Sequence, residues 1–133
     1  MMTIEVAAAI IKHNDKILVT RRSYGEFIDM WEFPGGKIEP SETREEALIR
    51  EIKEELEVNI NILDYLTTIE YDYPAFHLTM HCFICTICSG ELHLNAHNEA
   101  RWITNEQLYS LNWVPADILV AKKLENFNYN QEL

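Results

Sequence analysis

The stretch Thr43-Arg-Glu-Glu-Ala-Leu-Ile-Arg-Glu-Ile-Lys-Glu-Glu-Leu-Glu57 is the clearest helical segment of the chain, and it predicts an α-helix over residues 43–56. Thr43 can cap the first turn, and Glu46, three residues later, completes the capping box that is typical of a helix start. At about 100° per residue, the apolar side chains fall within one sector, which predicts the face that packs on a core. That sector contains Leu48, Ile49, Ile52 and Leu56.

A second sector of this helix is acidic. Glu51, Glu54 and Glu55 stand at positions i, i+3 and i+4, so their carboxylates are neighbours. Like charges at this spacing repel, and they lie toward the C-terminal end, where the helix dipole disfavours anions. A divalent cation between the carboxylates would explain both penalties, and oxygen ligands favour Mg²⁺, Mn²⁺ or Ca²⁺ over zinc. The alternative is a solvated acidic face without a ligand, because charge runs are usually surface features.

The segment ahead of the helix is suited to a phosphate. Gly35 and Gly36 let the backbone approach a ligand closely, and the ammonium group of Lys37 suits a phosphate as a point charge. Glu42, just before the helix, could complete an oxygen-rich site. Arg50 neighbours the acidic sector and could hold it in place, the alternative being an ordinary surface ion pair.

The remaining chain predicts strands around this helix and one further helix. Strands are expected at residues 4–11, 16–21, 31–33, 61–72, 76–88 and 100–103, and a last helix from Pro115 to about residue 127. No repeat or linker divides the sequence, so we expect one domain over residues 1–133, with a core at about 3–125 and a polar tail, 126–133, that frays. This order predicts an α/β fold in which a mixed sheet is sandwiched between helices.

Composition limits the partners. Acidic residues outnumber basic ones by 22 to 11, which gives a formal net charge of −11 and argues against a nucleic-acid polymer as a partner. The acidic protein could still bind a small phosphorylated ligand if metal cations bridge its carboxylates and the phosphates of the ligand. The hydrophobic fraction of 47% excludes wholesale disorder. No apolar run approaches the ~20 residues that span a bilayer, and no signal-peptide pattern is visible, so we expect a soluble, cytoplasmic protein without a membrane partner.

The cysteines and histidines receive no catalytic role. Cys82, Cys85 and Cys88 have a spacing that could indicate a metal cluster, but their segment resembles a strand. On a strand, the first and third would face opposite the second, so we interpret them as buried, reduced thiols. The histidines show no ligand spacing and are assigned no function. These are His13, His77, His81, His93 and His97.

Gly36, Glu42 and the run Arg50-Glu-Ile-Lys-Glu-Glu-Leu-Glu57-Val58 together resemble the signature of the Nudix hydrolases. All but one of its defining positions agree. The exception is Glu57, where the pattern has a glycine that would end the helix in the left-handed conformation, so the helix end is expected to shift toward Asn59. The resemblance covers roughly residues 3–125. Within the family, Trp31-Glu-Phe-Pro-Gly-Gly-Lys37 and the late Pro115-Ala-Asp117 segment resemble the MutT-type branch.

The resemblance implies the Nudix α/β/α sandwich and a set of site residues. The metal ligands would be Glu51, Glu54, Glu55 and the backbone carbonyl of Gly35. Arg22, Gly36 and Lys37 would contact the phosphates, and Asp117 would read the base, although an aspartate in a first helical turn is also favoured by the dipole alone. The branch often has one more acidic ligand, and Ala96 stands at that place, with Glu99 nearby as a substitute.

The implied reaction is hydrolysis of a nucleoside triphosphate to a monophosphate and pyrophosphate, with Mg²⁺ as cofactor and Mn²⁺ as the alternative. The expected catalytic set is Glu54, Glu51, Arg50 and Glu42, with Glu54 as the proton acceptor and Glu51 as the alternative. Oxidised nucleotides such as 8-oxo-dGTP are the expected substrates. The alternatives are cytidine-type triphosphates or a nucleotide-binding module without catalysis. The protein is expected to be a monomer or a homodimer.

Overall fold

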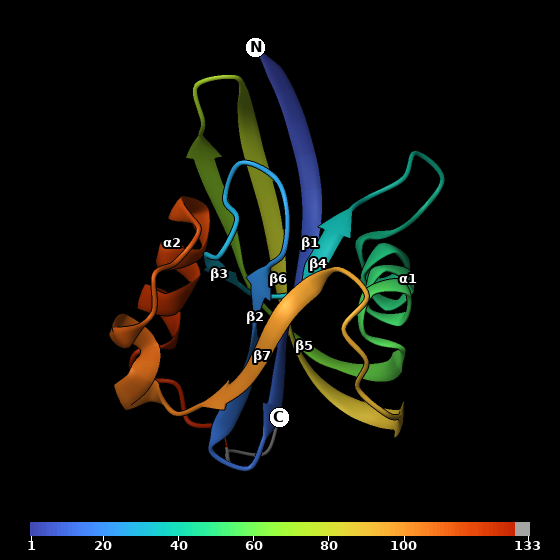
Figure 1. Ribbon diagram of the computed structural model, residues 1–133. Helices are drawn as coiled ribbons and strands as arrows, with labels where there is room; N and C mark the ends of the chain where they lie inside the picture. The colour runs from blue at the N-terminus through green and yellow to red at the C-terminus, as the bar shows by residue number, and fades with distance from the viewer. Residues whose placement is uncertain (130–133) are drawn as a thin grey trace.

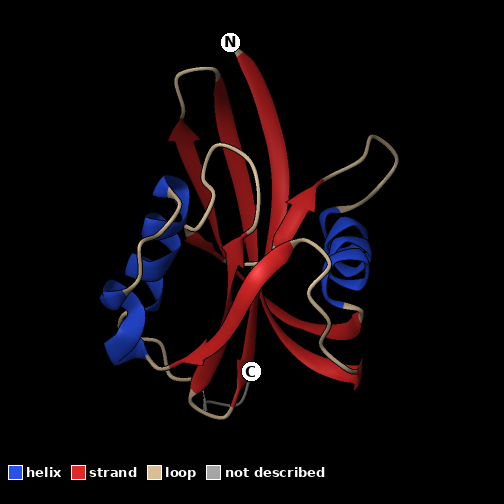
Figure 2. Ribbon diagram, in the orientation of Figure 1, coloured by secondary structure: helices blue, strands red, loops and turns tan. Residues whose placement is uncertain are grey.

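The computed structural model describes residues 1–129 of the chain, as strands packed between two helices. The strands are β1 Met2–His13, β2 Lys16–Arg22, β3 Trp31–Glu32, β4 Gly35–Lys37, β5 Val58–Asp72, β6 Phe76–Gly90 and β7 His97–Ile103. The helices are α1 Arg44–Leu56 and α2 Pro115–Leu124, with a short 3₁₀ helix, η1, at Asn105–Ser110. Figure 1 shows α1 and α2 on opposite sides of the strands, and Figure 2 shows the same three layers by type of element.

The sheet is mixed, as predicted. Its central strand β1 pairs in parallel with β6, Ala8 opposite Cys82, and β6 pairs antiparallel with β5. On its other side β1 pairs with β4, Ala7 opposite Gly36, and with β2 at the hairpin. Strand β2 continues to β3 and β7, which completes the order β3-β2-β1-β6-β5 with β4 and β7 as side branches. The α/β sandwich expected from the sequence is therefore confirmed.

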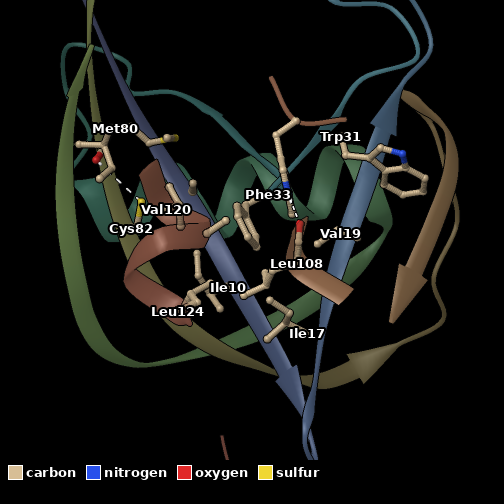
Figure 3. Close-up of a cluster of buried hydrophobic side chains, with 14 of the residues drawn as sticks. Ile10, Ile17, Val19, Trp31, Phe33, Met80, Cys82, Leu108, Val120 and Leu124 are labelled. Carbon is tan, nitrogen blue, oxygen red and sulfur yellow. Dashed lines mark hydrogen bonds between the residues drawn. The ribbon is translucent and has the colours of Figure 1, made fainter. Parts of the chain in front are cut away.

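Two cores lie on the two faces of the sheet, because successive side chains of β1 alternate. Ala7, Ala9 and Ile11 pack toward α1, whereas Ala8 and Ile10 pack toward α2. From α1 the residues Leu48, Ile52 and Leu56 are fully buried. Figure 3 shows the other core, where Val120 and Leu124 of α2 lie over Ile10 and Ile17.

Helix α1 begins as predicted but differs in two details. Thr43 and Glu46 form the capping box. Ile49, expected in the core, is 43% exposed, so the apolar stripe is narrower than the sequence suggested. The helix ends at Leu56, with Glu57 itself left-handed at φ 59°, and the expected shift toward Asn59 is wrong. Glu57 adopts the conformation that glycine would have provided.

The cysteine residues are free thiols. Cys82 lies in the core on the α2 side and Cys85 in the core on the α1 side, which confirms that they face opposite ways. Burial raises the pKa of the Cys85 thiol to about 12, and that of Cys82 further, so both stay protonated. Cys88 was expected to be buried, but it is exposed near the end of β6, with its thiol directed at the carbonyl of Asn59.

The end of the described chain contacts the rest of the domain at Tyr129. Helix α2 ends at Leu124, earlier than predicted. The side chain of Tyr129 is nevertheless buried, and the ammonium group of Lys12 donates to its backbone carbonyl over 2.5 Å. The expected fraying of the tail, residues 126–133, stays a prediction, and residues 130–133 lie outside the described residues. Neither helix in the described part of the chain combines the length and the apolar character needed to cross a membrane.

Candidate active site

The site is built where β4 passes between β1 and α1. A Cβ atom on Gly35 would lie 2.0 Å from the carbonyl oxygen of Ala7, so this strand can approach β1 only as glycine. A Cβ atom on Gly36 would lie 2.3 Å from the carboxyl carbon of Glu51. The two glycines therefore bring the backbone of β4 against a carboxylate of α1.

Arg50 holds the acidic cluster together, as the sequence suggested. Its Nε and Nη2 donate to the two oxygens of Glu42 over 2.7 and 2.9 Å, and Nη2 also donates to the carbonyl of Lys37. Its Nη1 donates to Glu51 over 2.9 Å and lies 3.3 Å from Glu54. The Arg50 hydrogen bonds, with one from the backbone of Glu39, lower the pKa of Glu42 to about 2. Glu42 thus anchors Arg50, and both its oxygens are already engaged.

Glu55 is the carboxylate that most needs a partner. Its Oε1 is buried and has no hydrogen-bond partner among the described residues. Burial, together with the nearby charges of Glu32 and Glu51, raises the pKa of Glu55 to about 8, although the backbone of Gly35 lowers it. Unpartnered buried oxygen is costly, so this group marks a place for a cation or a proton.

The donor set fits a hard divalent cation. Glu51, Glu54 and Glu55 offer carboxylate oxygens, the ligands that Mg²⁺ prefers, and the orphaned Glu55 oxygen is consistent with such an ion. Among residues 1–129, no three His, Cys, Asp or Glu side chains are already arranged as a metal cage. Arg50 contacts one oxygen of Glu51 and pairs loosely with the exposed Glu54, so these carboxylates can bind a cation while Arg50 keeps them in place.

A cleft extends from this cluster toward α2. Its polar end is lined by Arg22, Glu32, Gly35, Gly36, Lys37 and Glu55. Its other end is mainly apolar and aromatic, lined by Phe27, Phe33, Tyr73, Phe76, Leu78, Met80 and Asp117. The two ends share Arg22, Glu32 and the glycine pair, together with the apolar residues Val6, Phe76 and Leu78. The fold thus brings the expected phosphate contacts and the expected base-reading residue into one cleft.

Asp117 lies at the apolar end and is almost fully buried. Its Oδ1 accepts a hydrogen bond from the backbone N–H of Phe33 over 2.9 Å. Burial, and then the charge of Glu32, raise the pKa of Asp117 well above its ordinary value. A protonated carboxyl group can both donate and accept, whereas an ionised one only accepts.

Two residues that sequence reasoning did not assign complete the polar end. Glu32 accepts from Nε of Arg22 over 2.7 Å through one oxygen, and from Nε2 of His97 over 3.0 Å through the other. Burial opposes the charge on Arg22, but the pairing with Glu32 raises its pKa above the ordinary value. The only sequence signal was the place of Glu32 in the Trp-Glu-Phe run. His97 had none, because its partner is remote in the chain.

Glu99 does not line this cleft. Its carboxylate lies 2.6 Å from Nε of Arg101 and 3.5 Å from Nη1 of Arg21. Ala96 and His97, in contrast, do line the polar end. The place where an additional acidic ligand was expected is therefore occupied by alanine, with a buried histidine directly after it.

Comparisons with known proteins agree with this fold. The NUDIX domain family model matches residues 3–127. The chain is 33% identical over 119 residues to a CTP pyrophosphohydrolase of Escherichia coli, covering 89% of this chain and 88% of the relative. It is 31% identical over 127 residues to an 8-oxo-dGTP diphosphatase of the same organism, covering 94% and 98%. The solution structure of the MutT protein from methicillin-resistant Staphylococcus aureus is similar with a TM-score of 0.73 at 37% identity, covering 94% and 98%.

Proposed function

Since the chain belongs to the NUDIX domain family, we propose that it is a metal-dependent pyrophosphohydrolase that converts a nucleoside triphosphate to a monophosphate and pyrophosphate. The observation that carries the proposal is the unpartnered, buried oxygen of Glu55, which lies in a cleft that also presents Arg22 and Lys37. The carboxylate cluster can bind Mg²⁺, and the positively charged side chains of Arg22 and Lys37 can bind phosphate oxygens. Together they are suited to a polyphosphate with bound Mg²⁺. The net charge of −11 fits a free nucleotide rather than a nucleic acid.

The proposed division of labour follows from the contacts of each side chain. Glu51, Glu54, Glu55 and the carbonyl of Gly35 would hold Mg²⁺, or Mn²⁺ as the alternative. The ion supplies charge neutralisation and a bound water of lowered pKa. Glu54 accepts the proton of the attacking water, because its side chain is 58% exposed and only loosely paired with Arg50. Arg50 and Glu42 keep the carboxylates in place, and Arg22 and Lys37 bind the phosphate oxygens.

Asp117 would select the base. With its Oδ1 accepting from Phe33, a protonated carboxyl group still offers one O–H donor to the cleft and a lone pair beside it. Guanine oxidised at C8 presents an acceptor, O6, next to a donor, N7–H, whereas ordinary guanine presents two acceptors there. The lead proposal is therefore removal of oxidised guanine nucleotides such as 8-oxo-dGTP, which is also the activity in the name of one similar protein.

The second candidate is a cytidine-type triphosphate. Cytosine also presents an acceptor, N3, beside its amino donor, so the same protonated carboxyl group would match it. Another similar protein is named for this activity. Phe27, Tyr73 and Phe76 line the apolar end, and Phe76 lies 5.1 Å from Tyr73 between ring centres, so either base would meet aromatic side chains.

The test is a panel of ordinary and oxidised nucleoside triphosphates, with and without Mg²⁺ and with the products separated. We expect monophosphate and pyrophosphate only when the metal is present, and the best substrate decides between the two bases. Binding without any turnover would instead identify a nucleotide-binding module. Release of orthophosphate as the sole small product would contradict cleavage between the α- and β-phosphates.

A further inference from the structure

His97 is buried at the polar end of the cleft although no step of the proposed reaction uses it. Its side chain is 2% exposed, and its Nε2 lies 3.0 Å from Oε2 of Glu32. Because a carboxylate oxygen only accepts, Nε2 is the nitrogen that carries the proton in this contact. The other ring nitrogen, Nδ1, is buried and has no hydrogen-bond partner among residues 1–129. A buried nitrogen without a hydrogen bond destabilises the fold, and an apolar residue at this position would not have that cost. The presence of histidine therefore indicates a role beyond packing.

The two carboxylate oxygens of Glu32 contact different residues, the buried His97 and the partly exposed Arg22. One oxygen accepts from His97, which the fold buries in β7, and the other accepts from Nε of Arg22 over 2.7 Å. The side chain of Glu32 is 17% exposed, whereas that of Arg22 is 38% exposed and lines both ends of the cleft. The contacts therefore run from the interior of the sheet to the guanidinium group that meets the ligand.

Arg22 makes a second contact in the same conformation. Its guanidinium carbon lies 5.6 Å from the ring centre of Phe27, which belongs to the loop between β2 and β3. Stacking on Phe27 connects the guanidinium group to this loop, whereas the pairing with Glu32 connects it to β3. The hydrogen bond from His97 holds the carboxylate group of Glu32 that makes this pairing.

We propose that His97 is a positioning residue that acts through Glu32 to orient Arg22 toward the phosphates of the substrate. This inference rests on the proposed function, because it assigns the cleft to a nucleoside triphosphate. His97 does not touch the reacting atoms, and its contribution is to the binding of the phosphates.

The matched test is the pair His97→Gln and His97→Asn. The Nε2 of glutamine is as many bonds from Cα as the Nε2 of histidine, so it can still donate to Glu32, whereas the asparagine amide is one bond too short. The dissociation constant is measured by calorimetry with a triphosphate analogue that cannot be cleaved between its α- and β-phosphates. Hydrogen bonds to charged groups are the strong ones, so we expect about tenfold weaker binding for the Asn variant and wild-type binding, within about threefold, for the Gln variant. Steady-state kinetics should show the loss mainly in KM.

A double-mutant cycle separates positioning from a merely structural role. In an Arg22→Ala background, His97→Asn should change the dissociation constant less than about twofold, because the group it positions is gone. Equal losses in both backgrounds, or a Gln variant as weak as the Asn variant, would overturn the proposal. If the Asn variant does not fold, His97→Leu, which fills the buried position and likewise cannot donate to Glu32, takes its place in the same cycle with the same expectation.

His93→Asn is the control, since His93 is exposed and outside the cleft, and it should bind like the wild type. The cycle measures binding and not turnover, so its outcome can be told apart from that of the proposed function. A wild-type protein that binds the analogue but hydrolyses no nucleotide would contradict the proposed function alone. A wild-type protein that hydrolyses nucleotides but gives an additive cycle would contradict the role of His97 alone.

Discussion

Gly36 lies directly against the carboxyl group of Glu51, so that a Cβ atom on the glycine would come within 2.3 Å of the carboxyl carbon. The first prediction follows from this contact. Gly36→Ala should push the Glu51 side chain out of its place, because the three atoms nearest to the added methyl group belong to that side chain. We expect kcat/KM to fall at least about tenfold while the melting temperature changes little, since the displaced group is the end of a flexible side chain.

Gly35→Ala is the matched comparison for Gly36→Ala. Its added methyl group would meet the backbone carbonyl of Ala7 at 2.0 Å, which a strand pairing cannot relieve by a side-chain movement. This variant should lose stability, about 1–3 kcal/mol in urea unfolding, as expected for overpacking. If both variants lost stability equally and Gly36→Ala kept full activity, the contact with Glu51 would have no functional meaning.

Glu54 is the proposed proton acceptor, and Glu54→Gln tests it. The amide cannot take up a proton at neutral pH, so kcat should fall about 10²–10⁴-fold. The carboxylate is largely exposed, so the free energy of unfolding should stay close to that of the wild type. Glu45→Gln, an exposed change in the first turn of the same helix, should leave kcat unaffected. Full activity of the Glu54→Gln variant would transfer the role to Glu51.

What the sequence predicted well is local or periodic. The capping box of Thr43 and Glu46 spans only four residues, and the alternation of Cys82 and Cys85 follows from the strand period. Ile49 was misplaced because the helical wheel cannot say how wide a strip the sheet covers. A helical wheel describes the helix alone, whereas the burial of its side chains depends on the sheet on which it packs.

The candidate site was predictable only in part, for the same physical reason. The glutamates of α1 were found because they lie on one helix, and Arg50 because it lies among them. Glu32 and His97 were missed because their hydrogen bond joins residues 65 positions apart, on strands β3 and β7, which are brought together only because both pair with β2. The raised pKa of Asp117 likewise depends on a pocket assembled from distant segments.

Glu57 provides a prediction about stability. A non-glycine residue in the left-handed conformation is strained by roughly 1 kcal/mol, and glycine is not. Glu57→Gly would lose the hydrogen bond from the amide of Asn95, but this amide also donates to the carbonyl of Glu54 and would keep that contact. We expect the variant to be about 0.5–1 kcal/mol more stable in urea unfolding. Glu57→Ala loses the same hydrogen bond without relieving the strain, so a glycine variant no more stable than it would refute the explanation.

Glu55 should make stability depend on pH. Burial raises its pKa from 4.5 to about 8, so between these values the folded protein binds a proton that the unfolded chain has released. Linkage then requires the free energy of unfolding to fall as pH rises through this window. Below the window Glu55 is protonated in both the folded and the unfolded state, so it adds nothing to the pH dependence. Urea unfolding of metal-free protein from about pH 5 to pH 8 should show the decline, and Glu55→Gln should make it shallower. The pKa of Asp117 is also raised, so it contributes a decline in the same direction, and part of the pH dependence of stability will remain in the Glu55→Gln variant. An unchanged slope would mean that Glu55 ionises as readily in the folded protein as in the unfolded chain.

Asp117 connects the acidity of the cleft with the choice of base. If the protonated form is the one that reads the base, asparagine should replace it, since its amide supplies a donor and an acceptor at every pH and can still accept from Phe33. Asp117→Asn should keep kcat/KM for the best substrate within a few-fold near pH 7, and should lose less activity than the wild type as pH rises, because it has no proton to release. Asp117→Ala, which removes both groups, should lose about 10–100-fold for that substrate and little for a poor one. Initial rates with each base across the pH range measure both effects. An asparagine variant as impaired as the alanine variant would show that the ionised carboxylate, and not the neutral acid, contacts the substrate.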